Sequence, residues 1–149
     1  MEKFKEIKDE ILRRGYKANA CSDIKRAEDS ESMEELAQVI KDNFDWCVYK
    51  RVLDTEIIGK YKKEFASVDI YANESRSNGY VVIDREVNSI FGSTIAILYG
   101  DATVKYVSGN AYISVYSYIE CKISNHAIMR VRSENKIYTN TEVERPNNN

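Results

Sequence analysis

The stretch TIAILYGD-ATVKYVSG-N-AYISVYSY-IECKISNH-AIMRVRSE, residues 94–134, decides the fold of this chain. It consists of successive blocks of eight residues, with one extra residue, Asn110, between the second and third blocks. A partial block, NKIYTN, follows at residues 135–140. A short fixed period of this kind predicts a repeat architecture, in which each block is a copy of one structural unit.

Each block has the pattern of a short strand followed by a tight corner. The first, third and fifth positions are mostly apolar, and alternation with a period of two is typical of a strand with one buried face. In the second block this pattern predicts that Tyr106 points inward and Val107 outward. The seventh position of every block holds a small residue that favours turns. These residues are Gly100, Ser108, Ser117, Asn125 and Ser133.

Repeated corner chemistry is what a stacked solenoid requires, because each coil reuses the geometry of the previous one. Eight residues are too few to close a coil, so we expect a small β-solenoid with two blocks per coil. This pairing predicts two inward stacks, Ala96 with Ile113 and Met129, and Val104 with Cys121 and Ile137. An antiparallel meander of regular strands is the alternative.

The same pairing separates two outward faces of different character. One face carries the outward residues of the first, third and fifth blocks, six of which are apolar or aromatic: Ile95, Ile97, Tyr99, Tyr112, Ser114, Tyr116, Ile128, Arg130 and Arg132. The other face is a mostly polar set suited to solvent: Thr103, Lys105, Val107, Glu120, Lys122, Ser124, Lys136, Tyr138 and Asn140. Large apolar patches are rarely left exposed on monomers, so the first face is expected to be covered.

The first part of the chain is predicted to be helical. Residues 2–14 carry apolar side chains at helical spacing, and Gly15 is a suitable residue to end that helix. A short helical turn is expected after residue 22. Ser32 begins a capping box, S-x-x-E, ahead of a helix that runs to about residue 45, which Trp46 and its neighbours continue or kink. Asp54 is expected to cap a further helix with one apolar stripe.

These patterns predict an α+β protein: a helical N-terminal part followed by a small C-terminal β-solenoid. The helical part is assigned to residues 1–66 and the solenoid to residues 67–140. The tail TEVERPNNN, residues 141–149, contains the only proline and three terminal asparagines, and we expect it to be disordered.

Composition excludes several classes of function. The net charge of −2 gives no general attraction to nucleic acid. No run of residues approaches the roughly 18 apolar residues of a membrane span, and the charged start MEKFKEIKDE is no secretory signal. The three cysteines, Cys21, Cys47 and Cys121, are widely spaced and are expected to be reduced thiols of a cytoplasmic protein. We expect no metal site and no cofactor.

His126 is the only histidine, so a histidine-dependent catalytic arrangement would have to use it. Its block position predicts an exposed corner residue, whereas Cys121 is expected to point inward, away from that corner. Acidic residues of the helices alternate with lysine and arginine, as on a solvated face. We therefore expect no catalytic residues, and a protein that is not an enzyme.

The turn Asp45-Trp46-Cys47 after a helical start, followed by T-I-A-I-L-Y-G-D-A-T-V and G-N-A-Y-I-S-V-Y, resembles a group of short octad-repeat solenoid proteins. These proteins come from phages and mobile elements of Bacteroidetes, and the resemblance covers most of the chain. It implies a phage-borne accessory factor, of which inhibitors of host defence, such as anti-CRISPR proteins, are one kind. The shared motifs are structural, and the resemblance therefore assigns no catalytic residue.

The apolar face is the candidate partner-binding surface, because tyrosine and arginine dominate protein hot spots. Its candidate residues are Ile95, Tyr99, Tyr112, Tyr116, Ile128, Arg130 and Arg132. With the resemblance, this favours a host protein as partner, such as a CRISPR effector nuclease complex that the chain occludes. The chain's own helices, a homodimer mate, or single-stranded nucleic acid stacked on the tyrosines are the alternatives. Trp46 is either a second anchor or a core residue.

Overall fold

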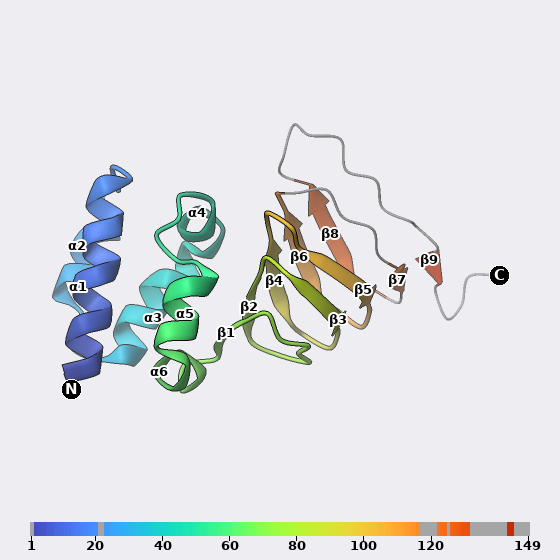
Figure 1. The fold of residues 1–149 in the computed structure, drawn as a ribbon, viewed down its shortest axis with the longest axis horizontal. Helices are drawn as coiled ribbons and strands as arrows, with labels where there is room; N and C mark the ends of the chain where they lie inside the picture. Colours follow the sequence, from blue (N-terminus) through green and yellow to red (C-terminus); the bar gives the residue numbers. More distant parts are fainter. Residues whose placement is uncertain (1, 21–22, 117–121, 125, 132–142, 145–149) are drawn as a thin grey trace. The chain divides into compact units, whose positions relative to one another are not determined.

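The computed structural model describes residues 2–20, 23–116, 122–124, 126–131 and 143–144 (Figure 1). The chain divides into two compact units, residues 1–68 and 69–149, which we call the helical unit and the strand unit. The division falls two residues after the predicted boundary. Among the described residues, the helices lie in the first unit and the strands in the second, so the fold is α+β.

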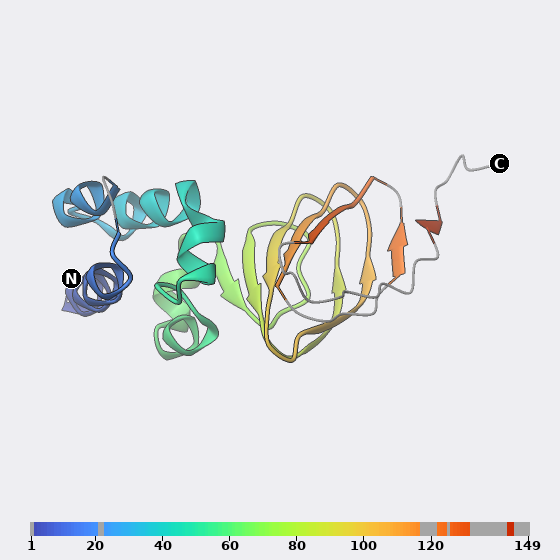
Figure 2. The same cartoon turned by 90° about the horizontal axis from the view of Figure 1, so that it is seen from above.

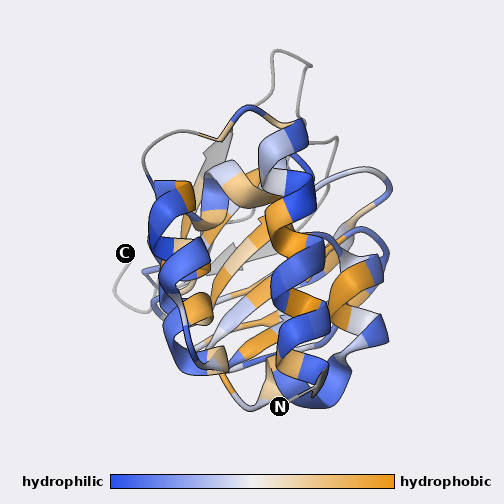
Figure 3. Ribbon diagram, turned by 90° about the vertical axis from the view of Figure 1, so that its left-hand side faces the viewer, coloured by the Kyte–Doolittle hydropathy of each residue, from blue (hydrophilic) through white to orange (hydrophobic). Residues whose placement is uncertain are grey.

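The helical unit is built from short amphipathic helices, and the hydropathy colouring of Figure 3 shows their apolar and polar sides. The helices are α1 (Glu2–Lys17), α2 (Asp23–Asp29), α3 (Met33–Asp42), α4 (Phe44–Tyr49), α5 (Thr55–Lys60) and α6 (Lys62–Ala66). Of the predicted apolar stripe of the first helix, Phe4, Ile7 and Ile11, the two isoleucines are buried and Phe4 is half-buried. Helical periodicity was therefore a reliable guide to the inward side of α1.

Two predicted helix starts are confirmed by their side-chain caps. The Ser32 hydroxyl accepts a hydrogen bond from the Glu35 N–H at 3.1 Å, and the Asp54 carboxylate accepts one from the Ile57 N–H at 3.0 Å. Each cap satisfies a backbone donor that the first helical turn leaves without a partner. The helix that starts after Ser32 breaks at Asn43, and the predicted Asp45-Trp46-Cys47 turn is part of the separate helix α4.

The predicted end of the first helix at Gly15 is wrong, because α1 continues to Lys17. The residue that takes the left-handed conformation is Asn19, with φ of 59°. The Ala20 N–H then bonds back to the Gly15 carbonyl at 2.9 Å, and the Asn19 N–H bonds to the Tyr16 carbonyl at 3.1 Å. This pair of bonds is a Schellman closure, in which asparagine replaces the more common glycine.

An ion-pair network joins α1 to the start of α5. Arg14 Nη1 lies 3.0 Å from Asp54 Oδ1, and Arg14 Nε lies 2.9 Å from Glu10 Oε1. Hydrogen bonds from Arg13 and from Arg14 lower the pKa of the Glu10 carboxyl to about 2. Because Asp54 also caps α5, the Arg14–Asp54 pair fixes the cap residue and links two helices at one point.

The strand unit contains two parallel sheets, and from the second strand onward the described strands alternate between them (Figure 2). Its strands are β1 (Ile70–Ala72), β2 (Tyr80–Ile83), β3 (Glu86–Ile90), β4 (Ile95–Leu98), β5 (Thr103–Val107), β6 (Tyr112–Val115), β7 (Lys122–Ser124), β8 (Ile128–Val131) and β9 (Val143–Glu144). One sheet has the order β1-β2-β4-β6-β8 and the other β3-β5-β7-β9. Each strand pair of the described residues is parallel, which excludes the antiparallel meander for this part of the chain.

The block register is confirmed in the five-stranded sheet. Ala96 pairs with Ile113, and Ile113 pairs with Met129, as the pairing of alternate blocks predicts. Ala96 and Ile113 are fully buried, and Met129 packs against the same core cluster. This cluster fills the space between the two sheets with inward residues from both of them. Burial of apolar side chains from both sides is therefore the main stabilising term of the strand unit.

The predicted alternation is wrong in β5. Val107, expected to point outward, is 1% exposed, whereas Tyr106, expected to point inward, is 50% exposed. The inward residues of this strand are Val104 and Val107, three positions apart, and they pair with Val87 and Ile90 of β3, which are also buried. Both strands place two outward residues in succession, so strict alternation fails at the same point in each.

The C-terminal strand of the second sheet also departs from the octad register. Val143–Glu144 lie in the segment expected to be disordered, and they form β9, which pairs with β7. Ile123 pairs with Val107 on one side and Val143 on the other, and these partners are 16 and 20 positions away. Cys121 and Ile137, the expected partners of Val104, lie outside the described residues.

A column of glycines shapes the corner that leads from β3 into β4 and from β5 into β6. Gly92 has φ of +63° and Gly109 has φ of +70°, in the left-handed region. The corners bond to one another along the stack: the Ser93 N–H donates to the Ser77 carbonyl at 3.0 Å, and the Asn110 N–H donates to the Gly92 carbonyl at 2.7 Å. Close backbone approach and positive φ together select glycine at these positions.

Candidate functional site

The candidate partner-binding residues lie on the five-stranded sheet, and the strand register brings them into neighbouring columns. Ile95 of β4 pairs with Tyr112 of β6, which pairs with Ile128 of β8. We call these three residues the outer column. Paired strands place their residues about 5 Å apart across the sheet, so the three side chains are successive neighbours on one face.

Tyr99 and Tyr116 lie directly after β4 and β6 at the other end of the same strands. The Tyr116 N–H donates to the Leu98 carbonyl at 2.8 Å, and the Tyr99 N–H donates to the Ile83 carbonyl at 3.0 Å. These bonds continue the parallel ladder past the strand ends and keep the two tyrosines in register. Tyr99, Tyr112 and Tyr116 all have interaction partners within the chain.

The remaining two candidates are the arginines at the C-terminal end. The backbone of Arg130 pairs with Ser114 of β6, so residue 130 belongs to the column that also contains Ile97. Arg132 lies outside the described residues. The structure therefore brings six of the seven predicted positions onto one sheet or its immediate continuation.

Exposure along this face increases towards β8. Tyr99 is buried, at 8% exposure, and Ile95, Tyr112 and Tyr116 are half-buried. Ile128, the last member of the outer column, is 56% exposed. An isoleucine has no polar group that water can satisfy, so full burial of its side chain would gain about 1.5–3 kcal/mol. Ile128 is therefore the described candidate residue with the most apolar surface to offer a partner.

Two neighbouring positions show that an outward place in the octad pattern does not mean that the side chain is exposed to solvent. Ile97 and Ser114 point to the same side as the candidates by register, yet each is 1% exposed. Fractional exposure depends on residues distant in sequence, and the octad pattern contains no information about it. Among the described candidate residues, the most exposed apolar side chain consequently lies at the β8 end of the predicted face.

The other sheet presents a mostly polar outward side, as predicted, with one exchange of residues. Thr103 and Lys105 are exposed, and Tyr106 occupies the exposed position expected for Val107. Tyr106 matches Ile128 in exposed fraction but lies on the opposite sheet. This residue is therefore a matched control for experiments on Ile128.

His126 lies in an exposed turn, which confirms the position predicted for it. Its backbone N–H donates to the Gly109 carbonyl at 2.8 Å, so the residue forms part of the stacked corner. Residue 121, the cysteine nearest to it in sequence, lies outside the described residues. The described hydrogen bond of His126 is thus made by its backbone and contributes to the stacking of the corners.

Within the described ranges, no group of three or more His, Cys, Asp and Glu side chains is arranged to hold a metal ion. None of the helices in those ranges is long and apolar enough to cross a membrane. Comparisons of the chain with protein-family models, with curated proteins and with solved structures each found no match.

The sequence predicted that Trp46 lies either in the core or at an interface, but it did not predict the cavity that Trp46 lines. Trp46 of α4 is half-buried and lines an apolar cavity inside the helical unit, together with Cys47. Amphipathic spacing predicts which side of each helix is inward, but it does not predict how completely the inward side chains fill the space between helices.

Proposed function

We propose that the chain is a non-enzymatic binding protein whose partner is another protein, held against the β8 end of the outer column. The observation that carries this proposal is the 56% exposure of Ile128 at the end of an apolar column that also contains Ile95 and Tyr112. A partner that covers Ile128 and the exposed part of Tyr112 would remove apolar surface from water along a fixed line.

The chemistry of this column favours a protein over nucleic acid. Isoleucine side chains cannot pair with phosphates or base edges, whereas the buried centre of a protein interface is apolar and enriched in tyrosine. The net charge of −2 provides no general electrostatic attraction to a polyanion. Single-stranded nucleic acid would depend on Arg130 and Arg132 instead, and its binding would weaken steeply with salt.

We also propose that the strand unit is a small β-solenoid with two octads per coil. From β2 onward, successive strands belong to alternate sheets, and the paired positions Ile95, Tyr112 and Ile128 are separated by 17 and then 16 residues. The single additional residue in the first interval is Asn110, the residue that interrupts the octads. A stack of this kind presents its outer column on a hydrogen-bonded and therefore rigid surface.

The resemblance to octad-repeat proteins of phages and mobile elements extends the proposal to the class of partner. On that basis the partner is a host defence protein, such as a CRISPR effector nuclease complex, and the chain acts in the host bacterial cytoplasm by covering a surface that the complex needs. Self-association through the same column is the alternative, because a two-fold pair would bury Ile128 against its own copy.

The test is affinity capture by the tagged full chain from a Bacteroidetes cell lysate, with and without added nuclease. We expect Ile128→Asp to reduce capture at least about tenfold, because it places a charge in a buried contact. Replacing Tyr112 and Tyr116 together by alanine should have a similar effect. Tyr106→Asp, a change of similar exposure on the opposite sheet, should leave capture unchanged.

Three results would contradict the proposal. Capture that survives Ile128→Asp in a variant with wild-type circular dichroism would place the partner elsewhere. Loss of the partner on nuclease treatment, together with a steep salt dependence, would favour nucleic acid. Recovery of the bait alone, with a dimeric mass, would identify the outer column as a self-association surface.

A further inference from the structure

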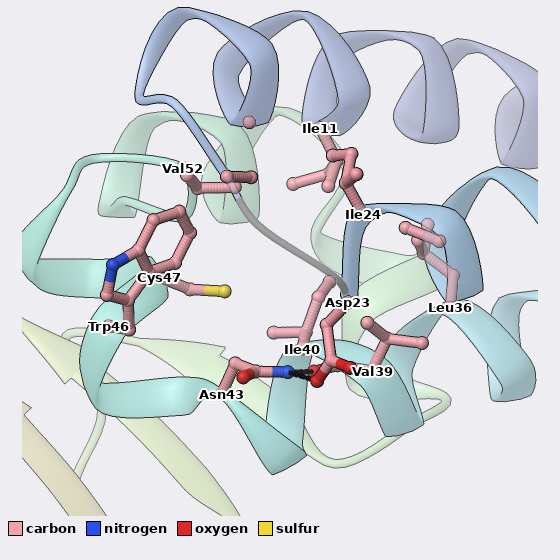
Figure 4. Close-up of a pocket in the computed structure, with 13 residues that line it drawn as sticks. Ile11, Asp23, Ile24, Leu36, Val39, Ile40, Asn43, Trp46, Cys47 and Val52 are labelled. Carbon is pink, nitrogen blue, oxygen red and sulfur yellow. Dashed lines mark hydrogen bonds between the residues drawn. The ribbon is translucent and has the colours of Figure 1, made fainter.

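The helical unit contains a cavity of about 200 Å³ that is lined from four helices and from the segment after α4 (Figure 4). Ile11 of α1, Leu36 and Ile40 of α3 and Val52 contribute to its wall, and all four are buried. Native interiors are usually filled to the density of organic crystals, with few voids larger than a water molecule. This cavity is larger than such voids, and it is partly open to solvent, so a small molecule can enter it.

Most of the wall offers nothing to which water can bond. A closed apolar cavity of about 150 Å³ accepts benzene, and the cavity here is larger but partly open to solvent. Isoleucine, leucine and valine side chains that face a void also lose dispersion contacts, which an apolar occupant would restore. The size and lining therefore suit a molecule with one or two rings.

One side of the cavity is polar and is held in place by hydrogen bonds. The Asn43 side-chain amide donates to Asp23 Oδ2 at 2.7 Å and to the Val39 carbonyl at 2.9 Å. Arg26 Nη1 lies 3.4 Å from the same Asp23 oxygen. Figure 4 shows the Asp23 and Asn43 side chains in contact at one edge of the drawn residues. The Asp23 side chain is 41% exposed, so this carboxylate lies at the rim of the cavity, where it is paired with Arg26.

The wall also carries the thiol of Cys47, whose sulfur points toward the space enclosed by the drawn side chains in Figure 4. Burial raises the pKa of this thiol to about 12, with a further contribution from the charge of Asp23. At neutral pH the group is a protonated thiol, which is a weak nucleophile and behaves as an apolar part of the wall. A non-covalent occupant is therefore the appropriate kind.

We infer that this cavity binds a small neutral aromatic molecule, with its ring among the aliphatic side chains and one O–H or N–H donor directed at the Asp23 carboxylate. A cationic ligand is disfavoured, because the aliphatic wall would strip its hydration and Arg26 already faces the carboxylate. The site lies wholly in the helical unit. It is independent of the binding surface proposed for the strand unit.

The experiment uses phenol, which has one ring and one O–H donor, and toluene, which has a similar shape without the donor. Trp46 lines the cavity and is the only tryptophan in the chain, so its fluorescence reports occupancy directly. We expect both probes at low millimolar concentration to change Trp46 emission and to raise the thermal midpoint of the full chain. Ala27→Leu, which adds carbon atoms to a buried lining residue of α2, should abolish both responses.

The variant Asp23→Ala distinguishes the contribution of the hydrogen bond to Asp23 from the contribution of apolar packing in the cavity. It should weaken phenol binding about threefold, because water also reaches the partly exposed carboxylate, and it should leave toluene binding unchanged. Toluene binding to this variant also shows that the cavity has kept its shape. The inference would be overturned if neither probe changed Trp46 emission in the wild-type chain, if a folded Ala27→Leu chain still bound them, or if Asp23→Ala weakened both equally.

Discussion

Replacement of Gly92 by alanine is expected to lower the free energy of unfolding of the strand unit by at least about 3 kcal/mol. Two effects add at this position. Gly92 has φ of +63°, where an L-residue with a Cβ is strained. The added Cβ would also overlap the backbone carbonyl oxygen of Ser77, which belongs to the preceding corner of the stack and accepts the hydrogen bond from the Ser93 N–H. A backbone atom in a ladder cannot move aside as a side-chain end can.

Two further glycines separate these effects. Gly100 has φ of +58°, but the nearest atom to its added Cβ would be the Asp84 Cβ at 4.0 Å, so Gly100→Ala should cost only the conformational strain of about 1–2 kcal/mol. Gly59 lies within α5 with open space around it, and Gly59→Ala should stabilise the helix by up to about 1 kcal/mol. Urea unfolding followed by amide hydrogen exchange of the strand segments for the strand unit, and by Trp46 fluorescence for the helical unit, measures both units. Equal losses for Gly92→Ala and Gly100→Ala would contradict the stacked corner.

Val107→Ala is expected to destabilise the strand unit by about 2 kcal/mol. The Val107 side chain is 1% exposed and belongs to the core cluster between the sheets, where Ile90 and Ile123 are its paired neighbours. Truncation removes buried methyl groups and leaves a void that the hydrogen-bonded strands cannot close. The urea midpoint of the sheet transition should fall without a change in slope.

The matched change is Tyr106→Thr at the adjacent position, which keeps a residue that favours strands but removes the ring. Because Tyr106 is 50% exposed, we expect its replacement to alter the free energy of unfolding by no more than about 0.5 kcal/mol. The strict alternation of the octads makes the opposite prediction, with Tyr106 inside and Val107 outside. A larger loss for Tyr106→Thr than for Val107→Ala would support that alternation and contradict the register described here.

Local signals in the sequence predicted a large part of this fold. The caps at Ser32 and Asp54 were predictable because a cap depends on a few consecutive residues. The stack of Ala96, Ile113 and Met129 was predictable because a repeat of constant length brings equivalent residues together. Both signals can be read from the segment itself, so no knowledge of distant contacts was needed.

One failure was local: the sequence offered both Gly15 and Asn19 as residues that tolerate positive φ, and it is Asn19 that takes this conformation after the end of α1 at Lys17. The other failures depend on contacts between distant segments. The pairing of Val143 with Ile123 joins segments that are 20 positions apart, and the octad period does not predict this spacing. For the candidate site, the octads predicted which residues share a face. They did not predict that Ile97 is buried and Ile128 exposed, because burial depends on the whole chain.

Site-specific photo-cross-linking tests the central claim most directly, namely that the β8 end of the outer column contacts a protein partner. A photoreactive phenylalanine derivative is introduced at residue 128 in one sample and at residue 106, of similar exposure on the opposite sheet, in the other. After irradiation in lysate treated with nuclease, we expect one discrete cross-linked protein from position 128 and none from position 106. Cross-links from position 106 alone, or the same products from both positions, would contradict the proposed binding surface.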